Sequence, residues 1–275
     1  MSEIIQLYPT PQRQLTLKGL YLKEQLHQCG NNDSAFIYAN FVSSLDGRIA
    51  LKGSGHEDSF MPEGMSNRND FRLFLELQAQ ADCLITHGGY LRVLAREQLG
   101  NVLQVGVQAG AEDLPVWRKL QGLKPQPDIV IASASLDFSL PDTLHDQGQS
   151  IIIVTGKIAD PARIRFWESE GCRVIIAGKD RLVEGDVLTQ ELETLGYRSI
   201  YLVAGPQMLD TMLRHNRLGR LYLTQRHRLF GGKDFHSMIP GGELGKAGHL
   251  SLRSLYYDAS TEEDGGTQLF ASYDL

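Results

Sequence analysis

Between residues 150 and 225, short apolar segments alternate with longer segments of helical periodicity, and this alternation constrains the fold more than any other feature of the chain. The apolar segments are uniformly hydrophobic, and they comprise residues 150–156, 172–178 and 199–203. Parallel strands have this composition because crossover helices cover both faces of their sheet. We therefore expect an α/β fold with a mostly parallel central sheet and helices on both faces.

Two of the expected helices carry recognisable boundary signals in the sequence. The best marked begins with Asp160 as N-cap and Pro161 at the first helical position, and it ends before Gly171. Another helix is expected to begin near residue 70, where either Asn69 or Asp70 could serve as its cap. These signals predict helices that are long enough to connect parallel strands.

The two ends of the chain depart from this rhythm. Residues 249–257 and 266–275 alternate between apolar and polar positions, which predicts a C-terminal antiparallel hairpin at a sheet edge. Residues 1–35 are polar and interrupted by prolines, although residues 15–26 could form one amphipathic helix. We expect residues 1–35 to be an N-terminal extension packed on a single domain of residues 36–275.

Composition and charge argue against several classes of protein. The net charge of −6 argues against a general nucleic-acid binder, and no apolar run approaches the roughly 20 residues of a membrane span. The three cysteines lack CxxC spacing and the eight histidines lack ligand spacing, so we expect neither a disulfide framework nor a metal site. The N-terminus does not resemble a signal peptide, and we expect a cytoplasmic protein.

Ligands of open α/β sheets bind beyond the carboxyl ends of the strands, where three glycine-rich loops are expected here. These loops are residues 43–55, 86–90 and 203–207. The third precedes a helix, and the unpaired N–H groups of a helix's first turn can hold a pyrophosphate. The common dinucleotide fingerprint, the P-loop and the nucleophile elbow are all absent from the sequence.

Four segments, in the right order, resemble the pyrimidine reductases of riboflavin biosynthesis. They are SLDGRIA at 44–50, LQAQADCLIT at 77–86, DIVIASASLDFSLP at 128–141, and the strand–turn–helix–strand segment 199–232. The resemblance spans about residues 36–273 and is to the C-terminal reductase domain of the bifunctional deaminase/reductase. It implies a dihydrofolate-reductase-like fold.

The resemblance also implies an activity. Members of this family use NADPH to reduce 5-amino-6-(5-phosphoribosylamino)uracil, or its deaminase precursor, to the ribitylamino product. Such an enzyme mainly holds two ligands in contact and excludes water. The alternatives are a related NADPH-dependent reductase of another pyrimidine- or pterin-like substrate, and a non-catalytic ligand-binding protein on this fold. The resemblance further suggests a homodimer.

The resemblance and the glycine-rich loops together indicate candidate site residues. Those expected to contact the cofactor are Val42, Ser43, Gly88, Gly89, Ser133, Ala204, Gly205, Pro206, Gln207, Met208 and Leu209. Those expected to contact substrate are His56, Glu57 and Val203. Asp46 is the candidate catalytic residue, since it could polarise substrate or assist a proton transfer, although an aspartate in such a loop often caps backbone N–H groups.

The chain departs from the family pattern on the substrate side. Gln78 stands where the family has an arginine, Tyr90 stands where it has a threonine, and the aspartate–proline motif that follows is missing. Val203 replaces an acidic residue that often precedes the last glycine-rich turn. Arg92 or Arg96 could supply phosphate contacts in place of the missing residues.

Overall fold

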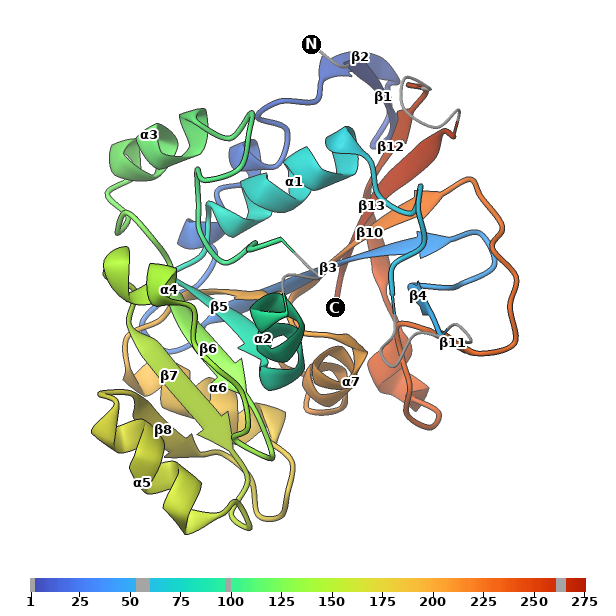
Figure 1. Cartoon of the computed structure of the whole chain (residues 1–275). Coiled ribbons are helices and arrows are strands. Elements are labelled where there is room, and N and C mark those ends of the chain that lie inside the picture. The colour runs from blue at the N-terminus through green and yellow to red at the C-terminus, as the bar shows by residue number, and fades with distance from the viewer. Residues whose placement is uncertain (1–2, 53–59, 97–99, 261–265) are drawn as a thin grey trace.

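The structure is a computed structural model that describes residues 3–52, 60–96, 100–260 and 266–275 (Figure 1). Strands and helices alternate through most of it. The strands are β1 (Glu3–Tyr8), β2 (Arg13–Thr16), β3 (Phe36–Ser44), β4 (Ala50–Leu51), β5 (Cys83–His87), β6 (Asp128–Ala132), β7 (Ile151–Thr155), β8 (Arg173–Ile176), β9 (Ser199–Leu202), β10 (Arg220–Arg226), β11 (Phe235–His236), β12 (Ser251–Asp258) and β13 (Gln268–Asp274).

The helices mostly connect successive strands. They are α1 (Arg68–Gln78), α2 (Gly88–Ala95), α3 (Asp113–Leu120), α4 (Asp142–Asp146), α5 (Pro161–Ser169), α6 (Gly185–Thr194) and α7 (Pro206–Arg214), with short 3-10 turns η1 (Leu22–Glu24), η2 (Leu26–Gln28) and η3 (Gly245–Gly248). Within the described residues, no helix combines the length and the apolar composition that a membrane span requires.

The described residues form one 11-stranded sheet in the order β2-β1-β12-β13-β10-β3-β9-β5-β6-β7-β8. The strands from β10 to β8 are parallel, whereas β13, β12, β1 and β2 join by antiparallel pairings. Apolar side chains of α1, α2 and α5 pack on one face, and those of α6 and α7 pack on the other (Figure 1). The expected mostly parallel sheet with helices on both faces is confirmed.

The sequence predicted the N-cap of α5 correctly and the N-cap of α1 wrongly. Asp160 caps α5 by accepting a hydrogen bond from the N–H of Ala162 at 2.9 Å, as expected. The cap of α1 is Asn67, whose side chain accepts from the N–H of Asp70, so neither Asn69 nor Asp70 is the cap. Polar residues run from 66 to 70, and only the one with extended backbone (φ −134°) can turn its side chain onto the first helical turn.

The helix expected over residues 15–26 is wrong. Residues 13–16 form β2, and the segment then continues through Gly19, at a φ of +83°, into two 3-10 turns. That φ suits glycine and stops an α-helix. The apolar residues of this segment that enter the core are Leu17, Leu20, Tyr21, Leu22 and Leu26.

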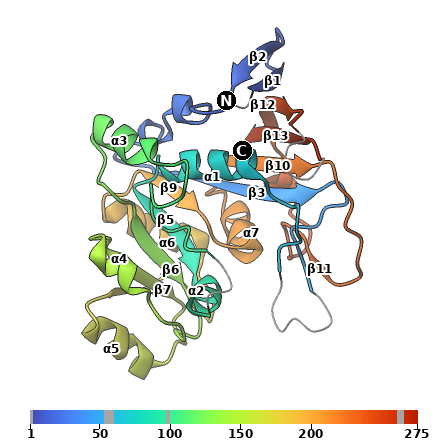
Figure 2. The same ribbon diagram turned by 45° about the horizontal axis from the view of Figure 1, so that its top comes forward.

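The C-terminal hairpin forms, but it does not lie at the sheet edge as expected. Strands β12 and β13 pair antiparallel, β13 continues the sheet to β10, and β12 pairs with β1. Strand β2 is therefore the edge on this side (Figure 2). The expectation failed because residues 3–16, expected to belong to an extension packed on the domain, supply two further strands of the sheet.

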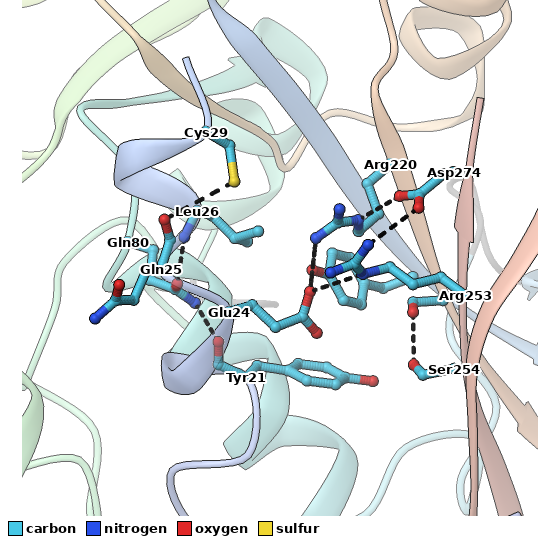
Figure 3. Close-up of polar contacts among 12 residues, drawn as sticks. Tyr21, Glu24, Gln25, Leu26, Cys29, Gln80, Arg220, Arg253, Ser254 and Asp274 are labelled. Carbon is cyan, nitrogen blue, oxygen red and sulfur yellow. Dashed lines mark hydrogen bonds and ion pairs between the residues drawn. The ribbon is translucent and has the colours of Figure 1, made fainter. Parts of the chain in front are cut away.

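Buried polar contacts attach the N-terminal segment to the antiparallel strands (Figure 3). The Glu24 carboxylate accepts from Arg220 Nη1 and from the Tyr222 hydroxyl, both at 2.7 Å. Arg220 Nε also donates to Asp274 at 2.7 Å. Burial raises the pKa of Glu24, although the hydrogen bonds and cations around it act in the opposite direction. The cluster therefore holds a carboxylate that needs its partners in order to remain buried.

Candidate functional site

The site begins where β3 continues past its neighbour. Strand β9 pairs with β3 only as far as Leu202 opposite Ala39, whereas β3 follows β10 as far as Ser44. Among the described residues, the backbone at Val42 and Ser43 consequently has a strand neighbour only on the β10 side. The chain also leaves β3 and β9 through helices on opposite faces, α1 and α7, and such switch points are where α/β sheets bind ligands.

The turn from β9 into α7 exposes helix N–H groups beside open space. Gly205 is the N-cap, Pro206 is the first helical residue, and Ala204 is buried beneath them. A Cβ placed on Gly205 would meet one atom within 4 Å, His87 Nε2 at 3.6 Å. The N–H of Gln207 has no hydrogen-bond partner among the described residues. The surface over Gly205 can therefore receive an anionic group.

The remaining cofactor candidates of this turn, Gln207, Met208 and Leu209, differ in how deeply they are buried. Gln207 is exposed and Met208 is half-buried against the core of the α6–α7 face. Leu209 is fully buried and anchors α7 on the sheet. Anchoring by Leu209 directs the N-terminus of α7 toward the carboxyl edge, where Gln207 is accessible to a ligand.

The second glycine-rich turn is packed against protein. Gly88 and Gly89 do not merely end β5, because they form the first turn of α2. A Cβ on Gly88 would lie 2.9 Å from Ser133 Oγ, and one on Gly89 would lie 2.8 Å from His87 Nδ1. Ser133 Oγ itself accepts from the N–H of Leu136 at 3.0 Å. The structure thus brings together Gly88 and Ser133, two separate cofactor candidates, and the close approach of α2 to the end of β6 leaves little room for a side chain at position 88.

Sequence reasoning missed His87, which joins the two turns. It is the N-cap of α2, and its Nδ1 accepts from the N–H of Tyr90 at 3.2 Å. Burial, followed by the positive charge of Arg92, lowers the pKa of His87. The signal available in the sequence was a histidine in the N-cap position, directly between a strand and two glycines. The side chain brings α2 and the Gly205 turn into contact.

Asp46 is held in place by its own loop contacts. Its carboxylate accepts from the Ser44 hydroxyl and the N–H of Gly231, the latter at 2.8 Å, and it forms an ion pair with Arg48 at 3.1 Å. Burial acts to raise the pKa of Asp46, but these hydrogen bonds and Arg48 outweigh it and lower the pKa to about 2. Asp46 is ionised near neutral pH, so a role as proton donor does not fit, and its catalytic assignment stays a prediction.

The structure says less about the three residues expected to contact substrate. His56 and Glu57 lie outside the described residues. Val203 is half-buried, its N–H donates to Ile85 O at 2.9 Å, and its side chain packs against the core of the α1 face. The described ranges contain no group of three or more side chains that could hold a metal ion.

Two adjoining pockets lie at the opposite edge, by the amino ends of the parallel strands. Their volumes are about 220 and 430 Å³, and they share Lys124, Asp128, Leu195 and Tyr197. The Asp128 carboxylate accepts from Lys124 at 2.6 Å and from the Tyr197 hydroxyl at 2.9 Å. Because these groups already satisfy one another, we place the candidate site at the carboxyl edge.

Comparisons with known proteins show the family and the fold of the chain. A family model described as the RibD C-terminal domain matches residues 35–261. A search of curated proteins finds no match. A pyrimidine reductase-like protein from Corynebacterium diphtheriae has a similar structure, with a TM-score of 0.66 and 17% identity over 94% of this chain and 98% of that one.

Two other solved structures are similar. The riboflavin biosynthesis reductase Rib7 of Saccharomyces cerevisiae has a TM-score of 0.57 and 15% identity over 93% of this chain and 98% of its own. RibD of Acinetobacter baumannii has a TM-score of 0.58 and 15% identity over 88% of this chain and 59% of its own. At these identities the likeness is one of fold.

Proposed function

The chain belongs to the RibD C-terminal domain family, and from this premise we propose that it is an NADPH-dependent reductase of riboflavin biosynthesis. Its substrate in this proposal is 5-amino-6-(5-phosphoribosylamino)uracil or the deaminase precursor of that compound. The observation that carries the proposal is the open surface over Gly205, which lies against His87 beside the N-termini of α7 and α2. A dinucleotide needs such a donor-rich surface for its phosphates.

The residues present fit a bound dinucleotide. The N–H groups of Gln207 and Gly89 have no hydrogen-bond partner among the described residues, so they are available to phosphate oxygens. The backbone of Val42 and Ser43, which has no strand neighbour on the side of β9 in the part of the chain that the structure describes, is suited to border the nicotinamide. When bound, NADPH supplies the hydride that reduces C1′ of the sugar. The chain's own work is to align the two ligands and exclude water.

One observation favours a second candidate, a related reductase of a pyrimidine- or pterin-like substrate. Gln78 is fully buried and its Nε2 donates to Val102 O at 2.7 Å. The Tyr90 hydroxyl donates to Gly100 O at 2.9 Å and accepts from the N–H of Val102 at 3.0 Å. Both side chains, at positions where the chain departs from the family pattern, hold residues 100–102 in place. A substrate without the ribose phosphate fits these contacts.

We further propose a homodimer, formed through the antiparallel end of the sheet. Neighbouring strands there place Leu223, Leu255 and Leu269 on the face opposite to α1, and all three are only half-buried. Tyr257 and Tyr273 extend the same face. A flat apolar surface of this kind is suited to a second copy of the chain. Light scattering after gel filtration tests this, and a monomer at micromolar concentration would refute it.

The cysteines support a reducing compartment. Cys29, Cys83 and Cys172 are all free thiols. Burial raises the pKa of Cys83 and Cys172, so both remain protonated and poorly reactive. We accordingly propose a cytoplasmic location.

The decisive experiment separates binding from turnover. NADPH binding is measured by nicotinamide fluorescence, and NADPH oxidation is then followed against phosphoribosylaminopyrimidines and a panel of other pyrimidines and pterins. Oxidation with the phosphoribosylaminopyrimidines supports the riboflavin reductase. Oxidation only with another substrate moves the assignment to the second candidate, and absence of NADPH binding refutes both.

A further inference from the structure

The orientation of the His87 ring determines what its two nitrogens can do. Nδ1 accepts a hydrogen bond from the N–H of Tyr90 at 3.2 Å, so Nδ1 carries no proton. In a neutral imidazole the proton then resides on Nε2, which becomes a hydrogen-bond donor. Protonation of Nδ1 would break the cap of α2, and burial and the charge of Arg92 also keep the ring neutral by lowering the pKa of His87.

Nε2 is directed at the other turn. Of the atoms in the described ranges, it is the one that a Cβ on Gly205 would meet within 4 Å, at 3.6 Å. On its other side, the ring is seated against Gly89, where a Cβ would lie 2.8 Å from Nδ1 and 2.9 Å from Cε1. The missing Cβ of Gly89 therefore lets the ring fit beneath α2, and the missing Cβ of Gly205 leaves the space next to Nε2 open.

The groups around this space are donors. The N–H groups of Gly89 and Gln207 have no hydrogen-bond partner among the described residues, whereas the N–H of Gly88 belongs to the pairing of β5 with β6. Arg92 lies on the same side, because its Nη2 is 3.6 Å from the position of a Cβ on Gly89. A neutral Nε2–H among unpaired amides and a guanidinium is suited to an oxygen of a phosphate.

We propose that His87 is a further cofactor-binding residue, whose Nε2–H donates a hydrogen bond to the diphosphate of a nicotinamide dinucleotide seated against Gly205. This inference rests on the proposed function, since it assumes that a dinucleotide occupies the carboxyl edge. The diphosphate is the recognised group because it lies at the middle of the dinucleotide, where it can reach both turns. The histidine thus has two separate tasks, a structural one at Nδ1 and a binding one at Nε2.

Two substitutions separate the tasks. Asn is a good N-cap and its amide oxygen can replace Nδ1, so His87→Asn keeps the cap and removes the donor. Gln is longer and its amide nitrogen can take the place of Nε2, so His87→Gln keeps a donor near Gly205 and weakens the cap. Dissociation constants for NADPH and NADH and the melting temperature are measured for the wild type and both variants.

The expected result is opposite in the two variants. His87→Asn keeps the melting temperature and weakens binding of both dinucleotides about tenfold, because one hydrogen bond to a charged group is lost. His87→Gln binds within about threefold of the wild type and melts at a lower temperature. Wild-type affinity in His87→Asn would overturn the inference, and so would weaker binding in His87→Gln than in His87→Asn.

The two dinucleotides and the wild type complete the test. An equal loss of affinity for NADPH and NADH supports contact with the diphosphate, whereas a loss confined to NADPH overturns it in favour of the 2′-phosphate. Failure of the wild type to bind either dinucleotide refutes the proposed function, and the inference about His87 with it. Binding by the wild type with no change in His87→Asn refutes the inference alone.

Discussion

The two edges of the parallel sheet are built in opposite ways. At the amino edge polar groups are buried and paired: Arg118 is 1% exposed, and its Nη1 donates to the carbonyls of Ala79 and Ala81 just beyond α1. The cluster of Glu24 and Arg220 lies at the same edge. At the carboxyl edge, by contrast, the N–H groups of Gly89 in α2 and Gln207 in α7 have no partner within the described residues.

The difference follows from how the chain crosses the sheet. A helix that links parallel strands ends near the amino edge and begins near the carboxyl edge. Its C-terminal carbonyls attract cations such as Arg118, and its N-terminal amides attract anions. The protein supplies its own cations at the amino edge, whereas the carboxyl edge is left for a ligand. Mutations at the amino edge should therefore lower the free energy of unfolding, and mutations at the carboxyl edge should weaken ligand binding.

The largest effect is expected at the amino edge from Arg220→Met. The Arg220 side chain is 8% exposed and pairs with Glu24, whose side chain is 15% exposed. Its removal leaves the buried carboxylate with only the Tyr222 hydroxyl and the more distant Arg253, at 3.8 Å, which costs about 3–5 kcal/mol in the free energy of unfolding. Urea denaturation measures this cost. Arg253→Met is the control, because its partly exposed side chain contributes about 0–1 kcal/mol.

A glycine-to-alanine substitution should have different effects at the two edges. Gly30→Ala is the substitution at the amino edge. A Cβ on Gly30 would lie 2.1 Å from the carbonyl oxygen of Arg198, and backbone must shift to admit it. Gly30→Ala is expected to lower the free energy of unfolding by about 1–3 kcal/mol. NADPH affinity, measured by fluorescence where the variant is folded, should stay at the wild-type value. A stable Gly30→Ala protein would show that the amino edge is looser than its contacts indicate.

Gly205→Ala is the matched change at the carboxyl edge. Since the space there is open apart from His87 Nε2, stability should remain within about 0.5 kcal/mol of the wild type. The new methyl group occupies the proposed phosphate position, so NADPH binding should weaken by about 1 kcal/mol or more. Unchanged affinity with intact stability would mean that no ligand contacts this turn.

The smallest expected effect is a dependence of the free energy of unfolding on pH. It arises from one histidine at each edge. Burial lowers the pKa of His27 at the amino edge and of His87 at the carboxyl edge. A histidine with a folded pKa below its unfolded value of about 6.5 contributes stability that is present above that pH and is lost as pH falls. The free energy of unfolding should therefore decline as pH falls below about 6.5.

Two variants, one at each edge, test whether these histidines cause the decline in the free energy of unfolding. His27→Gln and His87→Asn should each reduce the slope of stability against pH between about 5 and 6.5, before most carboxylates titrate. Urea denaturation at several pH values measures the slopes. A wild type whose stability is constant across this window would contradict the lowered pKa of both histidines.

Much of the parallel half could be predicted from the sequence. A strand covered on both faces must be apolar throughout, so residues 150–156 and 199–203 revealed β7 and β9 without tertiary information. Asp160 and Pro161 marked the start of α5 because capping is local. The four segments that resemble the pyrimidine reductases also indicated the family, which the match over residues 35–261 confirmed.

The tertiary structure alone decided what depends on contacts between distant parts of the chain. Strand β1 pairs with β12, and β2 joins the sheet only through β1, so the place of both strands depends on a partner from the far end of the chain. Asn67 caps α1 because its backbone, among several polar neighbours, is the extended one. His87 and Gly205 meet only because β5 and β9 are adjacent in the sheet. Periodicity determines the type of an element from neighbouring residues, whereas long-range packing determines which turns come together and so which side chains form a site.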